Sequence, residues 1–174
     1  MTHLQQSLVT LRIWGDDLVP AEVSALLGGE PTFGQAKGEP VTGVPSDHVR
    51  IATTGSWHLR APDCEPEDID SQVHGLLGAL TSDLAVWRRL RERFGVDLFC
   101  GLFMAHGNEG LALSPKTLVA LGVRGIELAL DIYAPRMDDQ PEAARAPSRK
   151  RRSVADAQVT DLLAGLDPHD DDEE

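Results

Sequence analysis

The segment from residue 96 to residue 133 constrains the fold more than any other part of the chain. Its sequence, VDLFCGLFMAHGNEGLALSPKTLVALGVRGIELALDIY, places short apolar runs between residues that favour turns and helix starts. These signals predict a strand at 96–104, the turn AHGN, a strand at 109–113, a helix from Pro115 to Gly122 capped by Ser114, and a closing strand at 125–133. Local signals that agree in this way indicate an α+β core.

The first thirty residues repeat part of this pattern. The alternation in LVTLRIW predicts a strand at 8–14 with one apolar face, and VPAEVSALLGG predicts a helix from Pro20 to Gly28. Both predicted helices have proline at the start and glycine at the end. The echo suggests two strand–helix–strand halves around one sheet, with the helices on one face.

The middle of the chain is less regular at first and then strongly periodic. Residues 28–55 are rich in glycine and proline, with at most a short strand near 48–52, and a clearer strand follows at 55–60. Apolar residues at steps of three and four then predict one long helix over 66–94. Trp87 continues that apolar stripe, so we expect it to lie in the core.

Together these elements predict one α+β domain at 1–134. Strands with one apolar face and helices with one apolar stripe favour two layers, an antiparallel or mixed sheet with helices packed on one face. Apolar residues make up 41% of the chain, enough for one core, while aromatic residues make up only 5% and predict a mostly aliphatic one. We expect the 1–134 fragment to fold alone.

The composition changes after Pro135, and 135–174 reads as a flexible, disordered and charged tail. The sequence SVADAQVTDLLAGL predicts a short amphipathic helix at 153–166 that is marginal alone. We expect it to order on a protein partner, in a groove of that partner or of the protein's own core. The candidate partner-binding residues form its apolar stripe: Val159, Leu162, Leu163 and Leu166. The basic run at 149–152 has two readings. It is either a solubilising charge block, or a functional segment that contacts an anionic partner or is masked by the acidic run at 170–174.

Charge and cysteine usage exclude several classes of protein. The formal net charge is −12, so the bulk field should repel phosphate backbones and nucleic acid is not an expected partner. The longest uncharged apolar run, 98–105, is far shorter than the roughly 20 residues of a membrane helix. Cys64 and Cys100 form no C-x-x-C pair, and Cys100 should be a buried thiol. No signal peptide is apparent, which predicts a soluble, cytoplasmic protein.

Four residues are candidates for a ligand site. Asp16 and Asp17 directly follow the first predicted strand, Lys37 lies in the irregular 28–55 segment, and Trp57 lies on the next strand. Long irregular segments in compact domains are often functional. An enzyme with a dispersed site could be built from these residues.

Other chemistry is weakly signalled. Asp97 and Asp131 could perform acid–base work or bind a hard cation, but their positions favour solvent-facing side chains or edge pairing. No histidines have metal-ligand spacing, there is no G-x-S-x-G elbow, and GEPTFGQAK at 29–37 lacks the lysine and hydroxyl residue of a phosphate loop. The sequence therefore predicts no catalytic residues, metal or cofactor.

Several motifs together resemble a known family. The order LRIWGDDLVPAEVSALLGGEPT, KGEP, TTGSWHL, RERFGVDLFCG, GNEGLALSP and IELALDIYA is similar to bacterial uncharacterised proteins of domain of unknown function 4279, over residues 8–134. The resemblance implies a small α+β domain in a soluble bacterial protein, and it implies no established activity or catalytic residues. The chain departs from it at 104–106, where the family often has a polar or charged residue.

The absence of a catalytic signature favours a non-catalytic binding or protein-interaction module, with an immunity or regulatory role as its conjectured form. The alternative is the enzyme with the dispersed site. The sequence does not indicate the oligomeric state.

Overall fold

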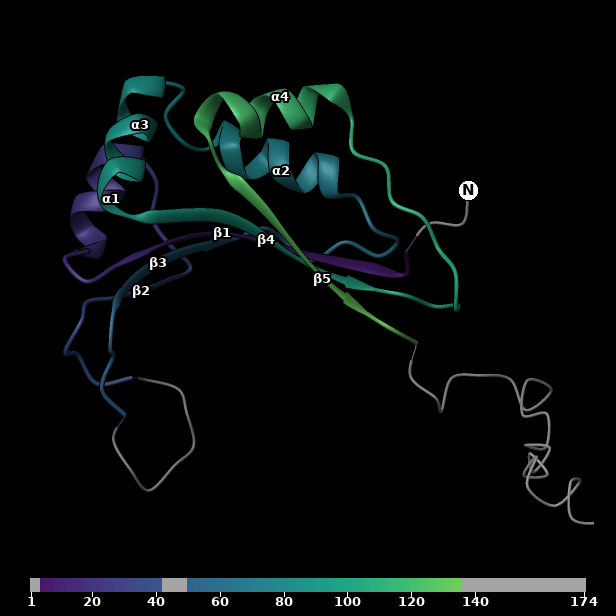
Figure 1. Ribbon diagram of the computed structural model, residues 1–174, viewed down its shortest axis with the longest axis horizontal. Coiled ribbons are helices and arrows are strands. Elements are labelled where there is room, and N and C mark those ends of the chain that lie inside the picture. The colour runs from purple at the N-terminus through teal and green to yellow at the C-terminus, as the bar shows by residue number, and fades with distance from the viewer. Residues whose placement is uncertain (1–3, 42–49, 136–174) are drawn as a thin grey trace, which may run out of the picture. The chain divides into compact units, whose positions relative to one another are not determined.

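The structure, a computed structural model, describes residues 4–41 and 50–135 (Figure 1). Its elements follow the order β1 (Gln6–Gly15), α1 (Pro20–Leu27), β2 (Phe33–Gln35), β3 (Gly55–Arg60), α2 (Ile69–Gly78), α3 (Leu84–Arg93), β4 (Gly95–Phe103), α4 (Pro115–Arg124) and β5 (Glu127–Tyr133). The predicted α+β class is confirmed. The predicted tail helix at 153–166 lies outside the described residues.

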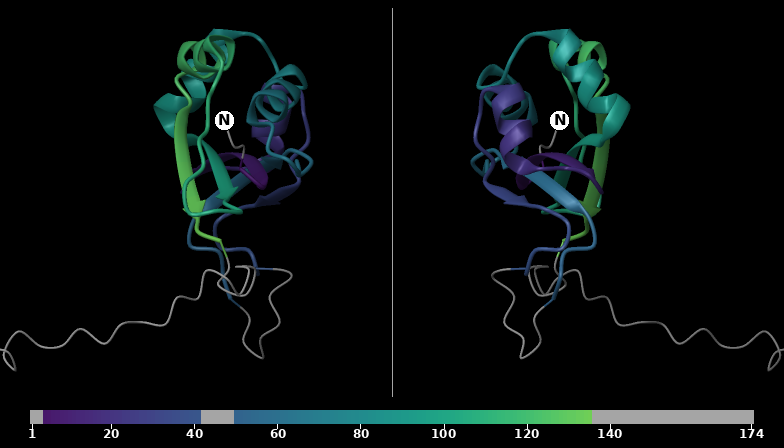
Figure 2. Two further views of the ribbon diagram at one scale, coloured as in Figure 1. Left: turned by 90° about the vertical axis from the view of Figure 1, so that its right-hand side faces the viewer. Right: turned by 90° about the vertical axis from the view of Figure 1, so that its left-hand side faces the viewer.

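The five strands form one mixed sheet in the order β2-β3-β1-β4-β5. All neighbouring strands are antiparallel except β4 and β5, which are parallel. All four helices lie on one side of this sheet, as the two side views show (Figure 2). The predicted two-layer arrangement is confirmed.

The core lies between the sheet and the helices. Val9, Leu11 and Ile13 alternate along β1 and are completely buried, because every second side chain of a strand points to the same face. Trp57 of β3 pairs with Ile13 and is also completely buried. Trp87 of α3 has no exposed surface, which confirms its predicted place in the core.

The single long helix predicted over 66–94 is wrong, because the structure has two helices, α2 and α3. Asp68 caps α2 by accepting a bond from the backbone N–H of Ser71 at 3.0 Å. Asp83 caps α3 by accepting from the N–H of Ala85 at 2.8 Å, so a new helix begins there. The chain turns between them, and the N–H of Thr81 donates to the carbonyl of Leu27 in α1.

The predicted strand at 109–113 is also wrong. β4 has β1 on one side and β5 on the other, so both of its edges are already paired. The loop after β4 is held by Glu109, which accepts from the N–H of Ala105 at 3.0 Å and contacts His106 Nδ1 at 2.9 Å. Near residues 48–52, the described part of the chain shows only an isolated bridge between Pro40 and Ile51.

The two halves suggested by the sequence echo have different topologies. Strand β4, helix α4 and strand β5 form a parallel crossover unit, whereas β1 and β3 are antiparallel. Both α1 and α4 start at proline and end before a glycine with positive φ, Gly28 at 75° and Gly125 at 62°. Helix α4 therefore ends at Arg124, just before Gly125, instead of at the predicted Gly122.

Candidate functional site: the open face of the sheet

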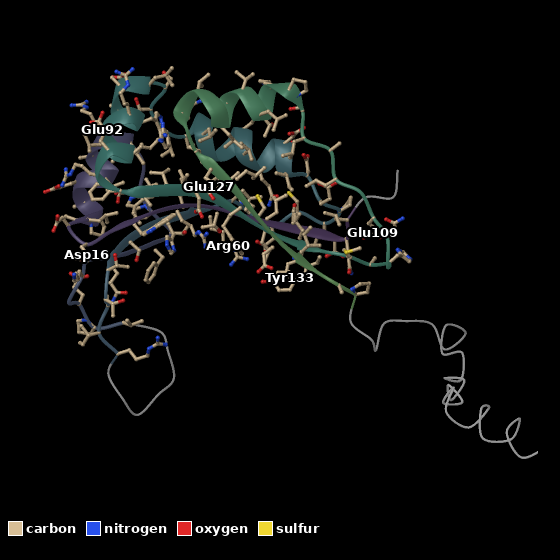
Figure 3. The ribbon with its side chains drawn as sticks, viewed as in Figure 1. Asp16, Arg60, Glu92, Glu109, Glu127 and Tyr133 are labelled. Carbon is tan, nitrogen blue, oxygen red and sulfur yellow. The ribbon has the colours of Figure 1, made fainter. Side chains whose placement is uncertain are left out.

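The face of the sheet opposite the helices carries a row of polar and aromatic side chains, which we call the open face. The strand register aligns one residue from each strand in this row: Phe33, His58, Arg12, Asp97 and Glu127. Figure 3 shows Arg60 and Tyr133 projecting from the same side of the sheet. Within the described ranges, no helix covers this face.

Arg12 and Asp97 form the centre of the row. Arg12 Nε donates to Asp97 Oδ1 at 2.8 Å and Arg12 Nη2 donates to Asp97 Oδ2, which makes the ion pair bidentate. The Asp97 side chain is only 8% exposed, while that of Arg12 is 33% exposed. The hydrogen bond to Asp97 raises the pKa of Arg12, although burial opposes this shift. The hydrogen bond to Asp97 therefore favours the charged form of the Arg12 guanidinium.

The placement of Asp97 corrects the expectation of a solvent-facing or edge position. β4 lies between β1 and β5, so Asp97 is not at an edge, and its mostly buried carboxylate is paired with the Arg12 guanidinium. Asp131 does lie on the edge strand β5, is exposed, and accepts a bond from Tyr133 Oη at 2.6 Å. The two aspartates therefore have different environments.

Two aromatic rings lie close to the Arg12 side of the ion pair. The Arg12 guanidinium lies 4.5 Å from the centre of the Phe99 ring and 6.0 Å from that of Trp14, within cation–π range. Trp14 covers Gly95, where a Cβ atom would lie only 2.4 Å from the indole ring. Further along the same face, the rings of Phe103 and Tyr133 stack at 4.8 Å.

His58 completes the row between Arg12 and Phe33. Its ring centre lies 5.5 Å from that of Phe33. Burial is the main cause that lowers the pKa of His58, and the positive charge of Arg12 adds to the effect. The imidazole therefore stays neutral at pH values where a free histidine would be partly charged.

This shift makes stability depend on pH. The pKa of His58 in the folded protein lies below the unfolded value of about 6.5. As the pH falls toward that value, the unfolded chain therefore binds more protons than the folded chain, which favours unfolding. We expect unfolding free energy measured in denaturant to decrease from pH 7.5 to 5.5, and the decrease to be smaller in His58→Gln. An identical slope in both proteins would contradict this assignment.

The structure brings together some of the predicted ligand residues. Lys37 Nζ forms an ion pair with Asp16, and this bond lowers the pKa of that carboxyl. Asp17 is exposed beside them. Trp57 is completely buried and donates to Ser24 Oγ at 3.1 Å, so its ring offers no surface to a ligand. The four residues do not form one site.

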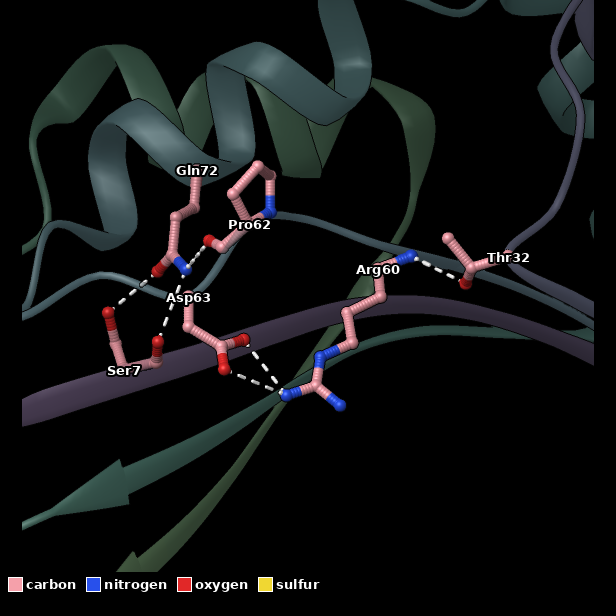
Figure 4. Close-up of polar contacts among 6 residues, drawn as sticks. All are labelled: Ser7, Thr32, Arg60, Pro62, Asp63 and Gln72. Carbon is pink, nitrogen blue, oxygen red and sulfur yellow. Dashed lines mark hydrogen bonds and ion pairs between the residues drawn. The ribbon is translucent and has the colours of Figure 1, made fainter.

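A cleft of about 400 Å³ lies beside the end of β3, between residues 59–64 and α2. Gln72 lines it, but its amide is occupied: Nε2 donates to the carbonyls of Ser7 and Pro62, and Oε1 accepts from Ser7 Oγ (Figure 4). Arg60 is paired with Asp63 at 2.9 Å. The rest of the lining is largely apolar, so the cleft offers little polar recognition.

The described residues show neither a cluster suited to a metal ion nor a helix suited to crossing a membrane. No group of three or more histidine, cysteine, aspartate or glutamate side chains is arranged to hold a metal ion in these ranges. None of the helices there combines the length and apolar character that crossing a membrane requires.

The chain was also compared with known proteins. Residues 4–135 match the family described as Domain of unknown function (DUF4279). The chain belongs to this family. The match covers every helix and strand of the structure, and the open face lies wholly inside it. No curated protein and no solved structure gave a significant match.

Sequence reasoning missed Arg12 and His58 as site residues. Both occupy polar positions in alternating strands, which is the ordinary pattern of a solvated sheet face. A stronger signal was available in β1, where Arg12 and Trp14 share the side opposite Val9, Leu11 and Ile13. An arginine and a large aromatic residue on the outer side of a strand are typical of interfaces.

Proposed function

We propose that this DUF4279 domain is a non-catalytic binding module whose protein partner docks on the open face of the sheet. The observation that carries the proposal is the half-buried Arg12–Asp97 pair on a sheet face that no described helix covers. An immunity or regulatory role in the cytoplasm is the specific form of this proposal that the sequence suggests.

The composition of the open face supports a protein partner. Trp14 is 39% exposed and Phe33 is 37% exposed, so aromatic surface is available around Arg12. Aromatic and arginine side chains are enriched at protein interfaces and supply much of their binding energy. Docking would bury these rings and remove the remaining water from the ion pair.

The charges on the open face favour a protein over a polyanion. Arg12 and Arg60 are accompanied by Asp97, Glu127 and Asp131, so both signs are mixed across the same strands. A nucleic acid site needs a surplus of positive charge along the phosphate path. A mixed pattern instead suits a partner with complementary charges at fixed positions.

The enzyme alternative has less support. Its Asp16–Lys37 pair is exposed, and its proposed aromatic residue, Trp57, is in the core.

A comparison of two matched variants tests the proposal. The open-face variant is Phe33→Ala with Arg60→Glu, and the control is Leu84→Ala with Arg88→Glu on α3. Phe33 and Leu84 are 37% and 42% exposed, and both arginines are exposed, so the two variants change side chains of similar exposure. Arg60→Glu also removes the exposed pair with Asp63. Each full-length protein would be used to capture partners from a lysate of the source cells, with quantitative mass spectrometry.

At least one protein captured by both the wild type and the control should be captured in an amount at least tenfold lower by the open-face variant. Circular dichroism should show that both variants remain folded. Equal capture by all three proteins, or loss in the control alone, would contradict the open face as the binding surface.

The tail provides a second proposed contact, which lies outside the described residues. Its apolar stripe, Val159, Leu162, Leu163 and Leu166, has the spacing of a helix that docks in a groove. Leu162→Asp with Leu163→Asp should then abolish association while the thermal melt of the main domain stays unchanged. Loss in this variant but not in the open-face variant would assign binding to the tail alone.

A further inference from the structure

The outer edge of the sheet at β5 has the features of a pairing surface. β5 is seven residues long and contains no proline or lysine, which natural edge strands often use to prevent pairing. Leu130 is 45% exposed and Ile132 is 59% exposed on its apolar side. In the part of the chain that the structure describes, no strand pairs with the outer side of β5.

The backbone of β5 shows which residues present hydrogen-bonding groups at this edge. The N–H of Met104 donates to the carbonyl of Tyr133 at 3.0 Å, so the backbone of Tyr133 points inward, toward β4. Backbone direction alternates along a strand. The N–H and C=O groups of Leu128, Leu130 and Ile132 therefore point outward.

A strand that pairs with this edge must place residues whose own N–H and C=O groups point toward β5 opposite Leu128, Leu130 and Ile132. For an antiparallel copy of β5, three alignments do so with long overlap, with the two-fold axis at Ala129, Leu130 or Asp131. The axis at Ala129 places Glu127 of one copy opposite Asp131 of the other. The axis at Asp131 places the Asp131 carboxylates of the two copies opposite each other. Like charges directly opposite each other are destabilising.

The axis at Leu130 avoids both repulsions. It places Leu128 opposite Ile132, Ala129 opposite Asp131, and Glu127 opposite Tyr133. All seven residues are paired, apolar residues meet on the helix side, and no carboxylate faces another. The sequence of β5 is thus complementary to itself in one register.

We propose that two copies of this chain associate through antiparallel pairing of their β5 strands, with the two-fold axis at Leu130. The five-stranded sheets then join into one sheet of ten strands, with the helices of both copies on the same side. The two open faces become continuous, since Tyr133 of each copy meets Glu127 of the other. Such a contact uses the same surface on both subunits.

Helix α4, which packs beside β5, also carries exposed apolar side chains. Helix α4 lies above β5 in Figure 2, and Leu118, Val119 and Val123 are all more than half exposed along it. The single charged side chain within its first two turns is Lys116. Apolar surface on both the strand and its helix makes the edge suitable for contact with another folded chain.

Two substitutions at one position test the register. In sedimentation equilibrium, the full-length wild type should show a species of twice the 18.8 kDa chain mass. Ala129→Glu would place a second carboxylate opposite Asp131 twice per dimer, and we expect the dissociation constant to rise roughly tenfold. Ala129→Lys places a positive charge there instead, so its dimer should be at least as tight as the wild type.

A cysteine pair of variants tests the axis directly. Leu130→Cys would place two thiols opposite each other at a Cα separation of about 5.5 Å, within disulfide range. Ile132→Cys replaces another apolar side chain, which is even more exposed, has no thiol opposite it and is the control. Under mild oxidation, Leu130→Cys should form the cross-linked dimer much faster than Ile132→Cys.

Three results would overturn the proposal. They are a wild-type monomer at all concentrations, equal weakening by both Ala129 substitutions, or equal cross-linking at both cysteine positions. The test does not depend on any other partner, because it measures self-association of the purified chain. Failure of the open-face proposal would leave these expectations unchanged.

Discussion

Replacing Trp87 by alanine should lower the free energy of unfolding by about 3–5 kcal/mol, the usual cost of removing a fully buried large aromatic side chain. Trp87 has no exposed surface, and its Nε1 donates to the carbonyl of Thr81 at 2.9 Å, in the turn between α2 and α3. The substitution therefore creates a cavity and also leaves that carbonyl without its partner. Urea denaturation of the full-length protein would measure the loss.

Leu84→Ala is the control on the same helix. Leu84 is 42% exposed, although it belongs to the apolar stripe that the sequence predicts, so its truncation should cost less than about 1 kcal/mol. A cost below about 1 kcal/mol for Trp87→Ala as well would contradict the burial of Trp87 in the core.

Arg12→Met should cost about 3 kcal/mol, because it leaves the carboxylate of Asp97 buried without its partner. Removing one member of a buried ion pair typically costs about 3–5 kcal/mol, and the partial exposure of Arg12 places the expected value at the lower end. Arg60→Met is the control. Its pair with Asp63 is exposed on both sides, so the expected cost is about 0–1 kcal/mol.

A double variant separates the lost pair from lost packing. Arg12→Met with Asp97→Val removes both charges, and replacing a whole buried pair by apolar side chains is often close to neutral. We expect the double variant to recover most of the stability that the single variant loses. A double variant as unstable as the sum of the two single variants would show that the pair is not coupled in the folded protein.

Much of the fold follows from local sequence signals. The strands near 8–14, 55–60 and 125–133 are predicted by alternation, and the helix from Pro20 follows from its proline start and glycine stop. These signals act over a few residues, so no distant contact is needed to recognise them. The burial of Trp87 follows in the same way from helical spacing.

The errors have physical causes. Leu80 and Leu84 keep a helical spacing across the break between α2 and α3. The apolar periodicity therefore predicts one continuous helix, although Asp83 caps a new helix there. The predicted strand at 109–113 has the right apolar residues, and Leu111 and Leu113 do pack against the core. It fails because β5, which comes later in the chain, takes the place beside β4.

The open face could not be found from local signals. Arg12 and Asp97 are 85 residues apart, and only the register of β1 against β4 brings them together. The same register aligns His58 with Arg12 and Glu127 with Asp97. Strand register depends on the whole sheet, so the sequence shows the residue types of this site without showing that they form one row.

Oxidative footprinting of side chains in the full-length protein, with and without its captured partner, tests the central claim most directly. If the partner docks on the open face, it should reduce oxidation of Trp14 and Phe33 several-fold and leave Leu84 on α3 unchanged. These three side chains have similar exposure in the free domain, 37–42%, so their changes can be compared. Protection of Leu84 without protection of Trp14 and Phe33 would place the partner on the helices and contradict the account.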